Sequence, residues 1–120
     1  MNRKRLSDSV AEFYNSDKPS KRFVAIYNGK KIYFGQPNAF TYLDGASDKA
    51  RDNYRARHLA NKTEKQRIEN LIPSAALFSY YLIWGEHRTI EENIKDLSKR
   101  FETGRTSLVG SAYAKSLIKR

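Results

Sequence analysis

The sequence predicts a small α+β domain in which a β-hairpin packs on three or four helices, with basic extensions at both ends. The chain has 120 residues, which suffices for one domain with a small hydrophobic core. Residues 22–35 are rich in β-branched and aromatic side chains around a turn signal, as is typical of a hairpin. From residue 47 onward the apolar residues recur at helical spacing or form a continuous run, which predicts helices.

The hairpin is predicted by Asn28-Gly29, a dipeptide that suits a type I′ turn because both central residues need a positive φ. Gly35 and Pro37 end the second strand, and residues 36–46 form an irregular connection. We expect this connection to cover the core with Phe40, Tyr42 and Leu43. The large side chains expected inside the core are Phe23, Phe34, Phe78 and Trp84.

Three helical regions follow, each with its own start signal. Ser47 is a good N-cap, and no glycine or proline interrupts the chain before Pro73, so residues 63–72 either continue the first helix or form a second one capped by Thr63. Ser74 precedes an apolar run that ends at Gly85 and indicates a buried helix. The last helix carries a capping box at its start and an apolar stripe: Thr89 and Glu92, then Ile90, Ile94, Leu97 and Phe101.

The two ends of the chain are assigned to extensions. We predict an N-terminal extension at 1–20 containing a short amphipathic helix, a compact α+β domain at 21–102 and a basic C-terminal tail at 103–120. A helix this short cannot hold itself together in water, so we expect the extensions to dock on partner proteins. The apolar residues expected to dock are Leu6, Val10, Phe13, Leu108, Val109 and Leu117.

Composition restricts the class of protein. The formal net charge of +10 favours a polyanionic partner such as nucleic acid, an anionic membrane or an acidic protein surface. The absence of cysteine excludes disulfides and thiolate metal sites. The basic N-terminus lacks the apolar run of a signal peptide, and no segment reaches the roughly 20 apolar residues of a transmembrane helix. We therefore expect a soluble, intracellular protein without a transmembrane segment.

The stretch from Ser47 to Lys62 is the candidate binding surface. On a helix, four of its residues would form one stripe, which two later residues would extend: Arg51, Arg55, His58 and Lys62, then Lys65 and Arg67. Such a cationic stripe suits phosphate or another anionic partner, and Arg3, Lys4 and Arg5 could join it. The alternatives are a helix braced against other proteins and a merely solvated helix, since Asp48 and Asp52 can neutralise part of the stripe.

Catalytic and metal sites are not predicted. The chain has none of the phosphate-loop, nucleophile-elbow or zinc-protease motifs, and the adjacent Glu91 and Glu92 diverge on a helix. His58 and His87 lack further ligands at close spacing, so neither a metal nor a cofactor is expected.

Three motifs together resemble a family of small basic proteins of uncharacterised function from large nucleocytoplasmic DNA viruses. They are "GKKIYFG", "DKARDNYRARH" and "LIWG" followed by "TIEENIKDL", and they cover roughly residues 22–101. The chain departs from the family pattern after Arg57-His58, where a tryptophan is often found and "LANKTEKQRIENLIP" stands here. The resemblance implies a viral origin and a place in the virion; it brings no catalytic residues.

These observations lead to one expectation and two alternatives. We expect a non-enzymatic structural component of a large DNA virus particle, such as a minor capsid protein that bridges capsid or other virion proteins. It would reside in the virion, and in the host-cell cytoplasm during assembly, without a small-molecule substrate. The first alternative is a DNA-binding protein that packages or condenses the viral genome. The second, a small enzyme or nuclease, would require a carboxylate cluster that the sequence lacks.

Overall fold

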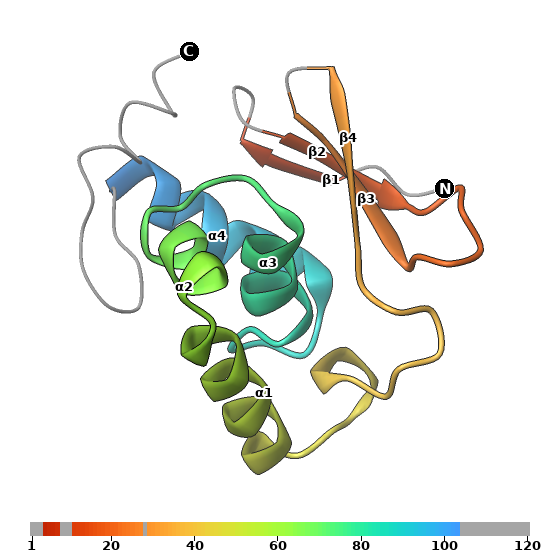
Figure 1. Cartoon of the computed structure of the whole chain (residues 1–120). Helices are drawn as coiled ribbons and strands as arrows, with labels where there is room; N and C mark the ends of the chain where they lie inside the picture. The colour runs from red at the N-terminus through yellow and green to blue at the C-terminus, as the bar shows by residue number, and fades with distance from the viewer. Residues whose placement is uncertain (1–3, 8–10, 28, 104–120) are drawn as a thin grey trace.

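The computed structural model describes residues 4–7, 11–27 and 29–103 and confirms the α+β fold. The part of the chain up to residue 34 forms an antiparallel sheet of four strands in chain order: β1 (Lys4–Ser7), β2 (Ala11–Asn15), β3 (Phe23–Tyr27) and β4 (Lys30–Phe34). The helices lie together on one side of this sheet, and α1 lies farthest from it (Figure 1). The meander therefore leaves β1 and β4 as the two edges of the sheet.

The predicted hairpin is confirmed as β3 and β4, with Tyr27 opposite Lys30 and Phe23 opposite Phe34. Gly29 has φ +74°, as a type I′ turn requires of its second central residue. Gly35, at φ +84°, follows β4 and lies so near η2 that an added Cβ would stand 2.7 Å from the Ile83 side chain. A glycine here thus permits both the backbone turn and the close approach of sheet and helix.

The short helix predicted within residues 1–20 is wrong, because this segment contributes strands β1 and β2. β2 pairs with β3, so that Phe13 lies opposite Ala25, and its burial pattern alternates as a half-buried strand requires. The hairpin alone would have left the edge of β3 unpaired, and β2 satisfies its backbone groups. Part of the segment assigned to the N-terminal extension is thus in the sheet; the three-part division of the chain otherwise stays a prediction.

The helical half begins with a 3₁₀ turn and then alternates helices with short joints. Its elements are η1 (Tyr42–Asp44), α1 (Asp48–Ala60), α2 (Lys62–Glu69), α3 (Ala75–Phe78), η2 (Ser79–Ile83) and α4 (Ile90–Thr103). Ser47 and Ser74 cap α1 and α3 as predicted, each accepting a hydrogen bond from a backbone N–H three residues on. Of the two possibilities left open after α1, the structure has a second helix, but Asn61 and not Thr63 caps it.

The apolar run after Ser74 is buried, as predicted, but it is not one regular helix. After α3 the turns widen, and the Trp84 N–H donates to the Ser79 carbonyl five residues back. Such π-turns place more side chains on each turn than an α-helix does. Every residue of η2 is buried, and η2 packs against α4.

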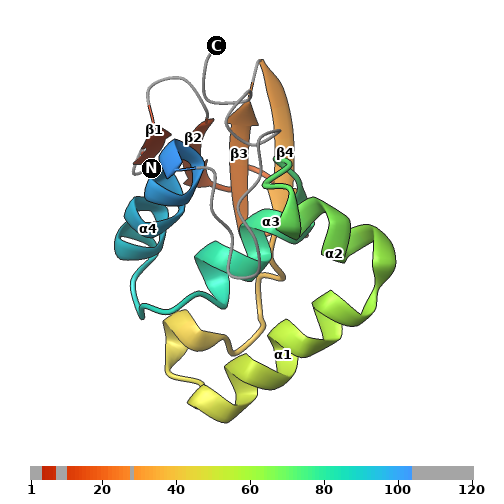
Figure 2. The same cartoon turned by 90° about the vertical axis from the view of Figure 1, so that its left-hand side faces the viewer.

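The core lies between the inner face of the sheet and the helices. The predicted core residues Phe23, Phe34, Phe78 and Trp84 are all buried. Phe34 lies 5.4 Å from Phe78 between ring centroids. On the connection after β4, Tyr42 is buried and Leu43 half-buried, but Phe40 is 68% exposed, so it does not cover the core as we expected. Figure 2 shows α4 in front of β1 and β2 and α3 beside the β3–β4 half of the sheet.

Asn93 of α4 is a buried polar residue that joins three segments. Its side-chain amide donates to the carbonyls of Leu82 (2.9 Å) and His87 (3.0 Å), and its Oδ1 accepts from the His87 N–H (3.0 Å). Gly85 lies against it, and a Cβ there would collide with the Tyr81 carbonyl oxygen. Asn93 therefore holds the loop after η2 against α4.

Candidate functional site

The arginines of the predicted basic stripe pack on tyrosine rings. The guanidinium of Arg51 lies 5.0 Å from the Tyr42 ring centroid, and that of Arg55 lies 4.4 Å from the centroid of Tyr80. Arg55 Nε is buried and makes no hydrogen bond with a described residue. A guanidinium over an aromatic face gains cation–π energy and buries its apolar stem. The two arginines are therefore braces between α1 and the rest of the domain.

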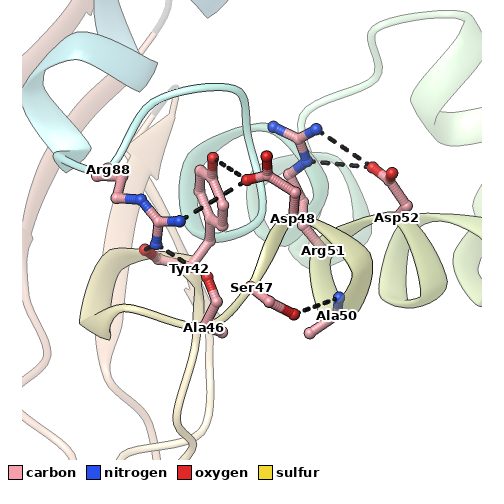
Figure 3. A network of polar contacts seen from close by, with 8 residues as sticks. All are labelled: Tyr42, Ala46, Ser47, Asp48, Ala50, Arg51, Asp52 and Arg88. Carbon is pink, nitrogen blue, oxygen red and sulfur yellow. Dashed lines mark hydrogen bonds and ion pairs between the residues drawn. The ribbon is translucent and has the colours of Figure 1, made fainter.

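Figure 3 shows how the start of α1 is attached to the loop before it. The Tyr42 hydroxyl donates to Asp48 (2.7 Å), and this hydrogen bond raises the pKa of the tyrosine. Arg88 covers the other side of the network: its guanidinium lies 3.9 Å from the Tyr42 centroid and donates to the Ala46 carbonyl at 2.8 Å. Arg51 pairs with the adjacent Asp52 at 3.2 Å. The network fixes the direction of α1 at its first turn.

His58 is packed at the other end of α1. Its Nδ1 lies 2.8 Å from a carboxylate oxygen of Glu64 on α2, and its side chain is 15% exposed. Its ring lies 4.5 Å from that of Tyr54, which in turn stacks on Trp84 at 4.4 Å and 15° between ring planes. His58 thus ties α1 to α2.

The remaining cations of the predicted stripe lie on α2 and extend into solvent. Lys62, Lys65 and Arg67 are exposed, and none of them forms an ion pair with a residue that the structure describes. The structure therefore divides the six predicted residues into a packed set on α1 and an exposed set on α2. The sequence pattern could not separate the two sets.

A groove of about 300 Å³ opens where the end of β4 meets α1, α2 and α3. One side is formed by residues 33–36 and by Lys21. Tyr54, His58 and Glu64 line the helical side. The groove is also lined by residues of α3, of η2 and of the position after it: Ala75, Ala76, Ser79, Ile83 and Trp84. Aromatic and aliphatic walls with a few polar groups are typical of binding sites.

The predicted docking residues are placed only in part. Phe13 is 2% exposed and belongs to the core, so in this fold it is not available to a partner. Leu6 lies within strand β1. Val10, Leu108, Val109 and Leu117 lie outside the described residues, as does Arg3.

A bidentate ion pair joins the base of the hairpin to η1. Arg22 donates to both carboxylate oxygens of Asp44, at 2.8 and 2.9 Å, and Asp44 also accepts from the Thr41 N–H and hydroxyl. These contacts, with Arg22 the largest cause, hold the pKa of Asp44 well below its ordinary value of 3.8. Thr41, which is held by Arg22 and Asp44, is one of the residues that line the groove, so the pair fixes this part of the groove wall.

Replacing Asp44 with asparagine should lower the free energy of unfolding by about 1 kcal/mol at pH 7, after allowance for partial exposure of the pair. Because folding lowers this pKa, the contribution of Asp44 is complete above its unfolded pKa of about 3.8 and is lost as the pH falls further. Urea unfolding of both proteins at pH 7 and pH 3 should therefore show a smaller difference at pH 3. Asp52→Asn, which breaks a more exposed pair, is the control and should change stability by less than about 0.5 kcal/mol. An equal or larger effect of Asp44→Asn at pH 3 would contradict this assignment.

Several groove residues carried no sequence signal of their own. Glu64 is one of several charged residues in its stretch, and Tyr54 stands among charged residues without a pattern that marks it. Their proximity to Trp84 depends on the turn of the chain at Asn61, which is the C-cap of α1 and the N-cap of α2. A histidine followed six residues later by an acid, across such a joint, is the one local signal that could have indicated the pair.

The described part of the chain holds neither a metal-binding cluster nor a membrane-spanning helix. Within residues 4–7, 11–27 and 29–103, no three histidine, cysteine or acidic side chains gather where they could hold a metal ion. None of the helices described there combines the length and apolar content needed to cross a bilayer.

Comparison with known proteins identifies the family of this chain but gives no activity for it. Residues 11–58, from the start of β2 to His58, match a family of unknown function (DUF5754). The uncharacterized protein L851 of Acanthamoeba polyphaga mimivirus is 47% identical over 75 residues, which cover 58% of this chain and 75% of that protein. No solved structure matches the chain. The resemblance to uncharacterised giant-virus proteins is thereby confirmed, and the chain belongs to the family of the mimivirus protein L851.

Proposed function

We propose that this chain is a non-enzymatic structural component of a large DNA virus particle, such as a minor capsid protein that bridges neighbouring virion proteins. The relative from a giant virus supports the setting. The observation that carries the proposal is the division of the predicted basic stripe: Arg51 and Arg55 of α1 pack on tyrosine rings and stiffen the domain, while the three cations of the stripe on α2 stay exposed. A rigid body with an exposed basic helix suits an acidic surface on a neighbouring protein.

Quantitative mass spectrometry of gradient-purified particles tests the role in the virion. We expect the protein at a fixed ratio to the major capsid protein, resistant to nuclease treatment, and recovered with the shell when particles are opened. Recovery with the genome instead would favour the packaging alternative. Abundance in infected cells combined with absence from purified particles would overturn both.

The exposed set on α2 also keeps DNA binding as a second candidate function. The slope of log affinity against log salt is negative, and each phosphate contact that is lost should reduce its magnitude by about 0.9. If α2 binds DNA, changing Lys62, Lys65 and Arg67 together to glutamate should therefore make the slope less steep by about 2 to 3. Fluorescence anisotropy with a labelled duplex over a salt series measures this.

The matched control changes the same amount of charge elsewhere on the surface. Lys30, Lys49 and Lys95 are exposed lysines on β4, α1 and α4. Changing these three to glutamate should weaken binding less than the α2 changes do. Equal slopes for the two triple variants would assign the affinity to overall charge and exclude a specific role of α2.

A further inference from the structure

The edge of the sheet at β4 is open along the described chain. The strand order ends at β4, and no backbone hydrogen bond joins its residues Lys31 or Tyr33 to another described segment. In a hairpin with a two-residue turn, the pair next to the turn, here Tyr27 and Lys30, is hydrogen-bonded, and bonded pairs alternate along the strands. Lys31 and Tyr33 therefore direct their backbone N–H and C=O groups away from β3.

The groove continues this edge. Residues 33–36, which end β4 and follow it, form one of its sides, so a chain lying along β4 would reach the groove directly. Tyr54, Ile83 and Trp84 also line the groove and suit an apolar or aromatic side chain. In Figure 2, β4 is the outermost strand on the side of α2 and α3, which bound the same groove.

The charge along the edge is positive. Lys21, at the groove, and Lys30 and Lys31, on β4, are all exposed. Only Lys31 among them has an ion pair with another described residue, a long one of 3.5 Å to Asp17 with both side chains more than half exposed. Lysines on an edge strand oppose the addition of a second β4 edge, because like charges would face each other, but they favour an acidic chain.

We propose that β4 and the adjacent groove together bind an extended acidic segment of a partner protein, which adds as a fifth strand and inserts one large apolar side chain into the groove. Main-chain hydrogen bonds to Lys31 and Tyr33 would supply affinity, and the groove would supply specificity. This inference rests on the proposed bridging function and names the kind of chain that is bridged. It concerns a different surface from α2.

The test is selection from a phage-displayed library of random linear dodecapeptides on the full-length protein, followed by anisotropy titration of the synthetic winners. The expected peptides carry acidic residues on both sides of an aromatic or large aliphatic residue. N-methylation of every second backbone nitrogen, along the peptide edge that faces β4, should weaken binding at least tenfold. It removes the N–H groups that would form hydrogen bonds with β4.

Two variants of the protein locate the binding site. Lys31→Pro removes an outward N–H while leaving the hairpin bonds of Lys30 and Ile32, and Lys31→Ala is its control because it loses only the charge. Ala75→Trp fills the groove from an exposed position, and Ala56→Trp, exposed on α1 outside the groove, is its control. We expect at least tenfold weaker binding for Lys31→Pro and Ala75→Trp than for their controls, with circular dichroism unchanged.

Three results would overturn the inference. The first is a selection that enriches no acidic peptide with an apolar centre. The second is a set of selected peptides whose affinity is the same for the wild type and for both variants. The third is displacement of the selected peptides by single-stranded oligodeoxythymidylate of the same net charge. The last would assign the edge to nucleic acid. The particle analysis is independent of these outcomes, so a failed selection beside a positive virion result would reject this binding mode alone.

Discussion

Replacing Phe13 with alanine should lower the free energy of unfolding by about 3–5 kcal/mol, the usual range for a fully buried phenylalanine. The Phe13 ring packs edge-on against Phe78 at 5.1 Å and Phe34 at 6.2 Å between centroids, so its removal empties the centre of the core. Urea unfolding followed by tryptophan fluorescence measures the loss, since Trp84 is buried in the same core.

Ser20→Ala is the control for this prediction, because Ser20 is exposed in the loop that joins β2 to β3. It should change stability by less than about 0.5 kcal/mol. A similarly small effect of Phe13→Ala would show that β2 is dispensable, and the segment before residue 21 would then be an extension as the sequence suggested. The expected large effect makes it part of the folded domain.

Replacing Asn93 with leucine, which has a similar volume, should lower the free energy of unfolding by about 3 kcal/mol or more. The substitution leaves the Leu82 and His87 carbonyls and the His87 N–H without their partner, and each buried unsatisfied group costs about 1–3 kcal/mol. Chemical denaturation gives the size of the effect, and hydrogen exchange should show faster exchange around residues 85–89.

Lys95→Leu is the matched control, since Lys95 lies two residues further along α4 and is exposed. It introduces the same side chain and should change stability by less than about 0.5 kcal/mol. If Asn93→Leu were equally mild, water would replace the lost partners and the amide would not be the joint between η2 and α4.

The sequence predicted where three of the helices begin. Ser47 and Ser74 accept the expected hydrogen bonds, and Thr89 bonds both the Glu92 side chain and its N–H. The apolar stripe of α4 also faces the core, with Ile94, Leu97 and Phe101 buried. Caps and periodicity act within a few residues, so they can be predicted without the tertiary structure.

What depends on distant partners could not be predicted. The spacing of Val10, Phe13 and Tyr14 fits a helical turn, but the unpaired edge of β3 makes a strand of residues 11–15. The sequence predicts correctly that Arg51 and Arg55 lie on a helix. The tyrosine rings on which they pack belong to residues 42 and 80, which are distant in the sequence from at least one of the two arginines. The groove likewise collects its walls from β4, α1, α2 and α3, whose approach no local pattern encodes.

The strict chain order of the sheet affects how the protein emerges during synthesis. Among the described elements, all four strands precede every helix, and each strand pairs with its neighbour in sequence, so the hairpins can form early and quickly. The inner face of the sheet, with Phe13, Phe23 and Phe34, is covered only after Phe78 and η2 have been synthesised. These leave the ribosome more than 40 residues after β4 ends. At about 5–20 residues per second, a nascent chain presents this aromatic face for several seconds. A chain cut short before α3 would keep it exposed permanently and is an aggregation hazard to the cell that makes it.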